Sequence, residues 1–185
     1  MKIKLACADF TFPILPHDQV LQLIPMLGIK GVDIGLFEDR SHLQPSSEFA
    51  SARRAARGAR RLKRQLDNNG LVAADLFLQL ALDYESRALN HPRSAIRRKA
   101  RDAFQHTLDY AAECKARHIT ALPGVHFNGE SRRDSTARAA EELAWRVAEA
   151  RAYRIVFAIE PHIDSFATTP KRTLDLLRDH LRSLE

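Results

Sequence analysis

The strongest constraint on the fold is a fivefold alternation of short apolar runs with longer segments of helical periodicity. The apolar runs span residues 3–8, 31–37, 71–78, 119–124 and 155–160. In the segments between and after them, apolar residues recur every three or four positions, which is the spacing of one helix face. These segments span residues 17–27, 48–69, 92–117, 135–152 and 170–181. Strands that alternate with helices predict an α/β fold with a parallel sheet covered by helices.

The segment 48–69 shows how its helix should sit in the fold. Its apolar stripe is narrow and consists of Ala52, Ala55, Ala59, Leu62 and Leu66, while arginines fill much of the rest. This pattern is typical of a surface helix with one buried edge and a solvated basic face. A polar loop is expected before it at 38–47, and Pro92 or Arg93 suits the first turn of the next helix.

Two architectures are compatible with five βα units in a single domain over residues 1–185. One is a TIM-barrel-type (β/α) fold that stops after its fifth unit, since a complete barrel takes about 250 residues. The alternative is an open doubly wound five-stranded sheet. Doubly wound nucleotide-binding proteins usually carry a glycine-rich turn after the first strand. Here that turn, residues 9–13, contains no glycine, and the chain has no Walker loop.

Composition excludes several other classes of protein. The chain is 45% hydrophobic, which is too apolar for a disordered segment. No apolar run approaches about 20 residues, so no membrane-spanning helix is expected, and Asp9 interrupts the N-terminal run too early for a signal peptide. Cys7 and Cys114 cannot form a disulfide framework or a zinc site by themselves. We therefore expect a cytoplasmic protein with free thiols, whose net charge of +6 attracts polyanions only weakly.

Polar residues collect just after the apolar runs, where parallel α/β folds form their ligand-binding edge. Glu160 follows the buried fifth run, and a carboxylate there must be paired, protonated or bound to a cation. Divalent cations favour such oxygen ligands, and His162 could add a nitrogen. His126 follows the fourth run, so its side chain would project into the same ligand-binding site at this edge of the sheet. The alternatives are a Glu160 paired with an arginine or a backbone amide, and two histidines that are merely solvated.

Four further carboxylates lie within or beyond the first three runs: Asp9, Asp33, Glu38 and Asp75. Each could contact a polyol, or could only organise neighbouring loops. Cys7, Cys114 and Trp145 are expected to be packing residues rather than reactive or base-stacking groups.

Three stretches carry a resemblance to a known family: Leu122-Pro123-Gly124-Val125-His126, the stretch from Phe157 through Glu160-Pro161-His162 to Ser165, and Thr168-Thr169-Pro170. Over essentially all 185 residues, in the order of its elements, the chain resembles the sugar phosphate isomerase/epimerase family, the xylose isomerase-like TIM barrels, which also include apurinic endonucleases. The run Gly31-Val32-Asp33-Ile34-Gly35 is similar to the family's second strand, where glutamate is commoner than Asp33. Asp164 stands where relatives often have glycine.

The resemblance implies a divalent metal ion (Mn, Mg, Co or Zn) held by strand-end Glu, Asp, His and Glu side chains. The ion would polarise an open-chain sugar or sugar phosphate, while a carboxylate removes the proton next to the carbonyl to form an enediolate. Glu160 matches the family's first metal-binding glutamate, which can also serve as an acid/base. His126 and His162 match loop positions that face the substrate.

The family's other metal ligands come from strands six to eight, which this sequence does not contain. The resemblance therefore implies an isomerase or epimerase that is incomplete as a lone chain. The alternative is a non-catalytic remnant or binding module completed by a partner subunit, for example in a homo-oligomer that covers the open edges of the first and fifth strands. A nuclease of the apurinic type is disfavoured, and nucleic acid is not expected as a partner, because few metal-binding histidines follow the strands.

Overall fold

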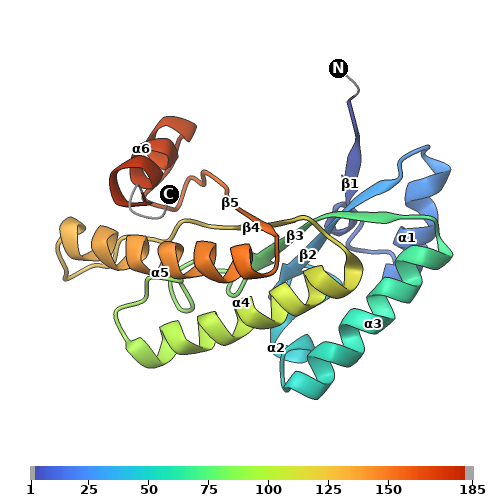
Figure 1. The fold of residues 1–185 in the computed structure, drawn as a ribbon, viewed down its shortest axis with the longest axis horizontal. Coiled ribbons are helices and arrows are strands. Elements are labelled where there is room, and N and C mark those ends of the chain that lie inside the picture. Colours follow the sequence, from blue (N-terminus) through green and yellow to red (C-terminus); the bar gives the residue numbers. More distant parts are fainter. Residues whose placement is uncertain (1–2, 182–185) are drawn as a thin grey trace.

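The computed structural model describes residues 3–181, which form one five-stranded parallel sheet with its helices (Figure 1). The strands are β1 (Ala6–Ala8), β2 (Gly31–Phe37), β3 (Val72–Gln79), β4 (His118–Ala121) and β5 (Val156–Ile159). The helices are the 3-10 helix η1 (Asp9–Thr11), α1 (His17–Met26), α2 (Pro45–Glu48), α3 (Ala52–Asn68), α4 (Ser94–Cys114), α5 (Arg132–Ala152) and α6 (Pro170–Leu181). No helix in this described part is long and apolar enough to cross a membrane.

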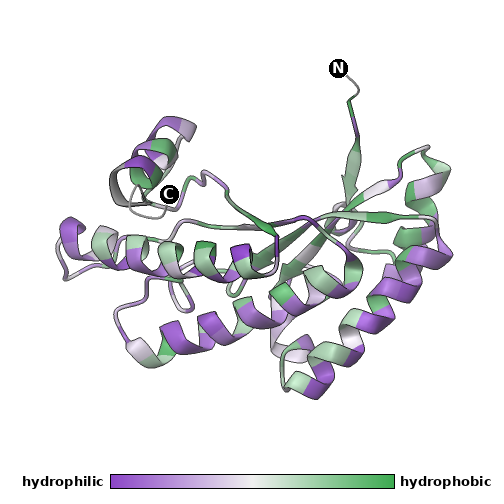
Figure 2. Ribbon diagram, in the orientation of Figure 1, coloured by the Kyte–Doolittle hydropathy of each residue, from purple (hydrophilic) through white to green (hydrophobic). Residues whose placement is uncertain are grey.

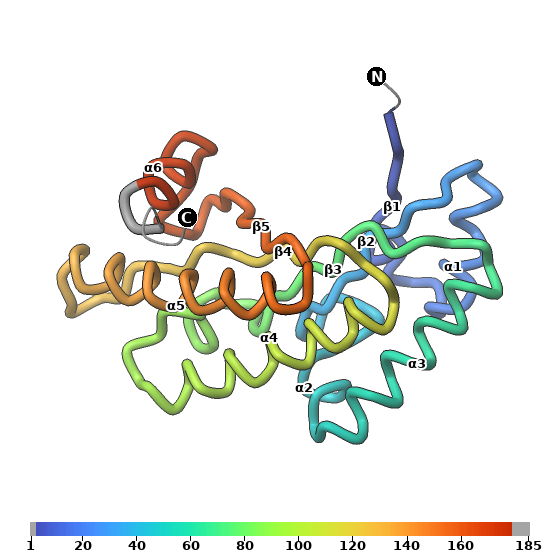
Figure 3. The backbone as a smooth tube through the Cα atoms, viewed as in Figure 1, coloured from blue at the N-terminus to red at the C-terminus, as the bar shows by residue number. Residues whose placement is uncertain are grey.

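The strand order decides between the two predicted architectures. The strands follow one another across the sheet as β1-β2-β3-β4-β5, and every neighbouring pair is parallel. Since βα crossovers are right-handed, steady addition on one side places the crossover helices on one face. Figure 3 shows α3, α4 and α5 along the same side of the sheet. The barrel-type prediction is confirmed, and the doubly wound alternative is wrong because that fold requires the strand order to reverse.

Successive side chains along the central strands point to opposite faces of the sheet. One face is covered by helices, and we call the other the concave face. Val32, Ile34 and Leu36 of β2 are fully buried on the helix side. A bulge in the β2–β3 pairing, between Val32 and Asp33, pairs Asp33 with Asp75. Both carboxylates therefore lie on the concave face, where β1 and β5 leave the sheet open within the described residues.

Several predicted helix boundaries need correction; for example, the helix expected at 135–152 begins earlier, at Arg132. The short helix α2 occupies the end of the expected loop, with Pro45 in its first turn. The next helix begins at Ala52 rather than at Glu48, because the Ser51 side chain accepts the amide hydrogen of Arg54 and caps it. Helix α4 begins at Ser94, so Pro92 precedes it.

The arginine-rich helix α3 has the expected narrow buried stripe, and its arginines are exposed. Figure 2 shows hydrophilic residues along most of this helix. Ala52 is the one member of the predicted stripe that is exposed. The stripe packs against α4, where Gly58 leaves room for the buried Tyr110 hydroxyl to donate to Glu48. Arg61 pairs with the same carboxylate at 2.7 Å. Burial, together with this carboxylate, raises the pKa of Tyr110 well above its usual value.

Candidate functional site

A hollow lies at the carboxyl ends of the strands, where parallel α/β folds bind their ligands. All five βα connections contribute to its lining. The lining residues are Phe10, Phe37, Arg40, Phe77, Gln79, Tyr84, Leu122, Glu160 and His162. These side chains come from elements far apart in the sequence, and the side-by-side arrangement of the parallel strands brings them together.

Aromatic rings form one wall of this hollow. The rings of Phe10 and Phe37 lie 4.7 Å apart, and Phe37 meets Phe77 edge-to-face at 4.9 Å. Phe10 can lie over β2 because Gly35 has no side chain. A Cβ at that position would meet the Phe10 ring at 2.6 Å. Such an apolar wall suits the C–H face of a polyol. These phenylalanines were not among the predicted site residues, and the signal that could have found them was their place near the ends of three strands.

Glu160 enters the hollow directly after β5. Its backbone amide donates to the carbonyl of Ala121 at 3.1 Å, which extends the pairing with β4 by one residue. Burial raises the pKa of the Glu160 carboxyl, His162 opposes this, and Asp75 adds to it. Among the described residues, none donates a hydrogen bond to this carboxylate, so the alternative of a Glu160 paired with an arginine or a backbone amide finds no partner there.

Two more carboxylates lie deeper on the concave face. Burial raises the pKa of Asp33, and the charges of Asp75 and Asp9 add to it. Burial also raises the pKa of Asp75, against the lowering effect of Thr120 and His118. The Oδ1 atom of Asp75 is buried without a hydrogen-bond partner in the described part of the chain. This face therefore carries several poorly compensated carboxylates.

Asp9 and Glu38 organise loops instead. Asp9 is fully buried, accepts the Gly35 amide at 2.9 Å, and lies 3.0 Å from Nε2 of His17. Glu38 accepts the backbone amide of Ser46 at 2.9 Å and so holds the start of α2. Of the four carboxylates that could contact a polyol, Asp33 and Asp75 are the two that the structure leaves without such a role.

The structure brings Glu160 and His162 together and places His126 elsewhere. The His162 ring lies 4.7 Å from the Tyr84 ring, and its Nδ1 accepts the Asp164 amide at 3.3 Å. His126 is not part of the lining of this hollow. Its ring packs 5.3 Å from Phe166, and its Nδ1 is buried without a partner in the described chain. Burial, with the charge of Arg132, lowers the pKa of His126.

The site does not by itself fit a catalytic metal ion. Across residues 3–181, no group of three or more His, Cys, Asp or Glu side chains is placed to hold one. Glu160 and His162 are two potential ligands, whereas catalytic zinc sites, for example, use three protein ligands. No step of a mechanism can therefore be assigned to a metal on these residues.

Sequential parallel strands, helices on one face and a site at the strand ends define the class of α/β barrel proteins. The chain belongs to the xylose isomerase-like TIM barrel family, whose model matches residues 21–184. The sequence matches no curated protein.

Solved structures share this fold at low sequence identity. They include an L-ribulose 3-epimerase (13% identity, TM-score 0.72), a putative xylose isomerase from Rhodospirillum rubrum (17%, 0.73) and an AP endonuclease of family 2 from Brucella melitensis (16%, 0.72). The match covers 97%, 96% and 97% of this chain, but 57%, 61% and 66% of those chains. The chain thus spans about three fifths of the length of these relatives.

Proposed function

We propose that this chain supplies the first five βα units of a sugar isomerase or epimerase site, in which Glu160 moves a proton next to the sugar carbonyl. The observation that carries the proposal is the half-buried, raised-pKa carboxyl of Glu160 at a strand end, facing an aromatic-walled hollow. A raised pKa brings a carboxyl closer to neutral pH, where it can both take and return a proton. The epimerase and isomerase structures with the same fold support this reading.

The residues of the hollow have separate roles in the proposed reaction. The Glu160 carboxylate takes the proton from the carbon beside the carbonyl, the electron pair of that bond moves onto the carbonyl oxygen, and an enediolate forms. Delivery of a proton to the former carbonyl carbon, with transfer of the neighbouring hydroxyl proton to the former carbonyl oxygen, gives the isomer. Delivery of a proton to the opposite face of the original carbon, with the carbonyl re-formed, gives the epimer. His162 lies beside the substrate, and the aromatic wall excludes water. A divalent cation such as Mn, Mg, Co or Zn could take Glu160 and His162 as two ligands, and its remaining ligands would have to come from outside the described residues.

Deuterium exchange tests the proton transfer without requiring net turnover. The chain is incubated with ketohexoses and their phosphates in D₂O, with each divalent metal in turn, and NMR follows loss of the proton beside the carbonyl. We expect exchange above background, and a loss of roughly 100-fold or more in Glu160→Gln. Glu38→Gln is the matched control, because Glu38 holds a loop. Equal rates in Glu160→Gln and the unaltered chain, or no exchange with any metal, would contradict the proposal.

The second candidate is a binding module completed by a partner subunit, including a second copy of the chain. Its specific support is the exposure of Val72 and Val156, which are 61% and 55% exposed at the starts of β3 and β5. Sedimentation velocity at micromolar concentration distinguishes the candidates. A dimer or larger assembly without deuterium exchange would favour the module, whereas a monomer would contradict it.

A nuclease activity is not proposed, although one similar structure is an AP endonuclease, because the carboxylates of the concave face would repel a nucleic acid backbone. A cytoplasmic location is proposed on the basis of the two free cysteines, Cys7 and Cys114.

A further inference from the structure

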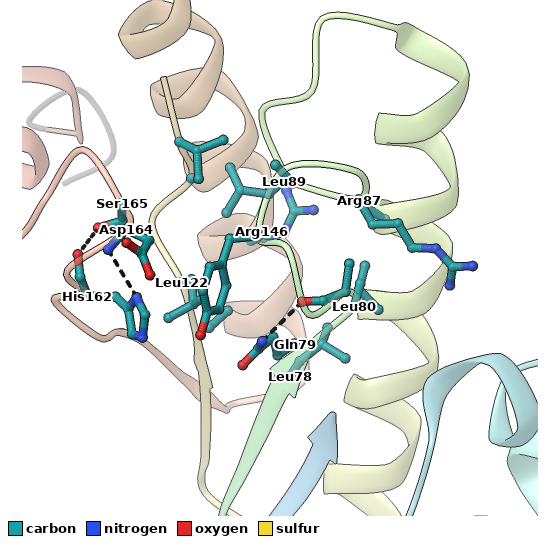
Figure 4. Close-up of a pocket in the computed structure, with 17 residues that line it drawn as sticks. Leu78, Gln79, Leu80, Arg87, Leu89, Leu122, Arg146, His162, Asp164 and Ser165 are labelled. Carbon is teal, nitrogen blue, oxygen red and sulfur yellow. Dashed lines mark hydrogen bonds between the residues drawn. The ribbon is translucent and has the colours of Figure 1, made fainter. Parts of the chain in front are cut away.

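A second pocket adjoins the candidate site on the helix side (Figure 4). It has a volume of about 60 Å³ and lies between the ends of β3 and β4 and the helices α4 and α5. Gln79, Tyr84, Leu122 and His162 line both this pocket and the hollow that holds Glu160. The remaining walls are mainly apolar: Leu78, Leu80, Ala81, Ala88, Leu89, Ala100, Ala121 and Val125.

One charged side chain, Arg146 of α5, lines this apolar pocket while being only 3% exposed. Both of its hydrogen bonds use Nη1, which donates at 2.9 Å to the backbone oxygen and to Oε2 of Glu142. The rings of Phe104 and Trp145 cover the guanidinium at 5.5 and 5.6 Å. Within the described residues, Nε and Nη2 have no acceptor, so the edge of the guanidinium that could grip two oxygens is free.

The charges around Arg146 do not balance. Glu142 is the carboxylate that Arg146 contacts, and it also accepts hydrogen bonds from Arg97 at 3.2 Å and from Arg101 at 2.9 and 3.0 Å. One buried carboxylate therefore serves three guanidinium groups. Burial lowers the pKa of Arg146 to about 10, against the opposing effect of Glu142, which leaves the group charged at neutral pH.

The other charged residues of the lining do not supply the missing anion. Figure 4 shows Arg146 on the helix side of the pocket and Asp164 on the opposite side, beside His162 and Ser165. Asp164 is exposed, so its charge is solvated. The side chain of Arg87 points away from the pocket, toward the outside. Arg146 therefore stands as a buried cation that faces an apolar space.

We propose that this pocket binds the carboxylate of a small aliphatic acid, with its two oxygens on Nε and Nη2 of Arg146 and its carbon chain against the apolar wall. A planar guanidinium edge matches a carboxylate bidentately. The volume of about 60 Å³ corresponds to roughly four to six water-sized groups, which is the size range of acetate to butyrate. Inorganic phosphate fits less well, since the apolar walls offer it few further donors.

NMR titration of the ¹⁵N-labelled chain with butyrate tests the pocket, with chloride at equal ionic strength as the comparison. We expect saturable shifts at Leu122, Ala81 and Ser165, and an affinity at least tenfold lower in Arg146→Met. Arg87→Met removes the same charge from an outward-pointing side chain and should bind butyrate as the unaltered chain does. Equal affinity in the two variants, or the same shifts with chloride, would overturn the proposal.

A second variant keeps the test decisive if Arg146→Met does not fold. Ala81→Leu fills the pocket from a half-exposed loop position and leaves every charge in place. It should reduce butyrate affinity at least tenfold while thermal unfolding remains close to that of the unaltered chain, and unchanged affinity would overturn the proposal. The test does not depend on catalysis, because Glu160→Gln should bind butyrate normally. Its outcome therefore stands apart from the outcome of the deuterium exchange.

Discussion

The two faces of the same sheet are built in opposite ways. On the helix side, Ile34, Leu76 and Ile119 of three neighbouring strands are fully buried in one continuous hydrophobic core. On the concave face, Asp33 pairs with Asp75 across β2 and β3, and burial raises the pKa of both carboxyls. Residues one position apart in a strand therefore meet an apolar core on one side and an acidic surface on the other.

Within a single strand, the residues on the helix-covered face therefore serve stability, whereas those on the concave face are candidates for ligand binding. The helix-covered face of the sheet is stabilised by close packing of apolar side chains. The concave face holds charges that folding alone disfavours, because their ionised forms lose hydration without gaining a cation. Such uncompensated groups are typical of sites that bind a ligand. Mutations on the two faces should therefore have different consequences.

The largest effect is expected in the helix layer, at the buried carboxylate of Glu142. Glu142→Gln removes the buried carboxylate that Arg97, Arg101 and Arg146 share and should lower the free energy of unfolding by roughly 3–5 kcal/mol. The neighbouring control Glu141→Gln, an exposed carboxylate 3.8 Å from Arg101, should change it by less than about 1 kcal/mol. Urea unfolding measures both, and equal effects would contradict the assignment of Glu142 as the centre of the network.

The same variant has a definite pH dependence. Burial acts to raise the pKa of Glu142, but Arg101 and Arg146 outweigh it and hold the pKa below its usual value. The stabilisation by Glu142 is therefore present above the ordinary glutamate pKa and is lost as the pH falls through the lowered pKa. The difference between Glu142→Gln and the unaltered chain should shrink in that acidic range.

The next largest effect is expected at a buried residue of β3, and an exposed residue of the same strand provides the comparison. Leu76→Ala removes a fully buried side chain on the helix side of β3 and should cost about 3 kcal/mol of unfolding free energy. Val72→Ala, four residues earlier and 61% exposed, should cost less than about 0.5 kcal/mol. Similar losses at both positions in urea unfolding would mean that another surface covers Val72 in solution.

The smallest effect is expected on the concave face, and it should have the opposite sign. Because burial raises the pKa of Asp75, its ionised form weakens the folded state at neutral pH. Asp75→Asn should therefore be more stable than the unaltered chain at pH 7. The gain should disappear as the pH falls through the raised pKa toward the ordinary aspartate pKa, since Asp75 is then protonated in both states.

Asp83→Asn provides the reverse control in that pH series. The backbone amide of Ser86 and neighbouring hydrogen bonds lower the pKa of Asp83, so this variant should lose stability at pH 7, and that loss should vanish in acid. Thermal unfolding across the pH range measures both variants. Loss of stability in Asp75→Asn at pH 7 would show that the carboxylate is compensated in solution.

Much of the fold could be predicted, because its signals are local. Strand and helix periodicity depends on neighbouring residues, and the helix predicted to begin at residue 170 does begin at Pro170, where Thr169 accepts the Arg172 amide. The short helix α2 was missed because four residues carry no periodicity. The sequence also could not exclude the doubly wound sheet, since strand order is a property of long-range pairing.

The candidate site was predictable only in part. Glu160 and His162 share a hollow because both follow β5, two residues apart. His126 satisfied the same rule after β4 and lies outside that lining, because its ring packs against Phe166. Asp9 and Asp33 look equivalent in the sequence, but only Asp9 finds two hydrogen-bond partners, from segments 8 and 26 residues away.

By itself, the sequence determined the type and order of the βα units and the strand-end position of Glu160, since both follow from patterns among near neighbours. Tertiary structure alone decided which carboxylates share the concave face, because a bulge between Val32 and Asp33 sets the pairing of Asp33 with Asp75. It also decided that Arg146 faces a pocket, since that placement depends on three elements packing together. Burial and charge balance are sums over the whole fold, and no local pattern encodes them.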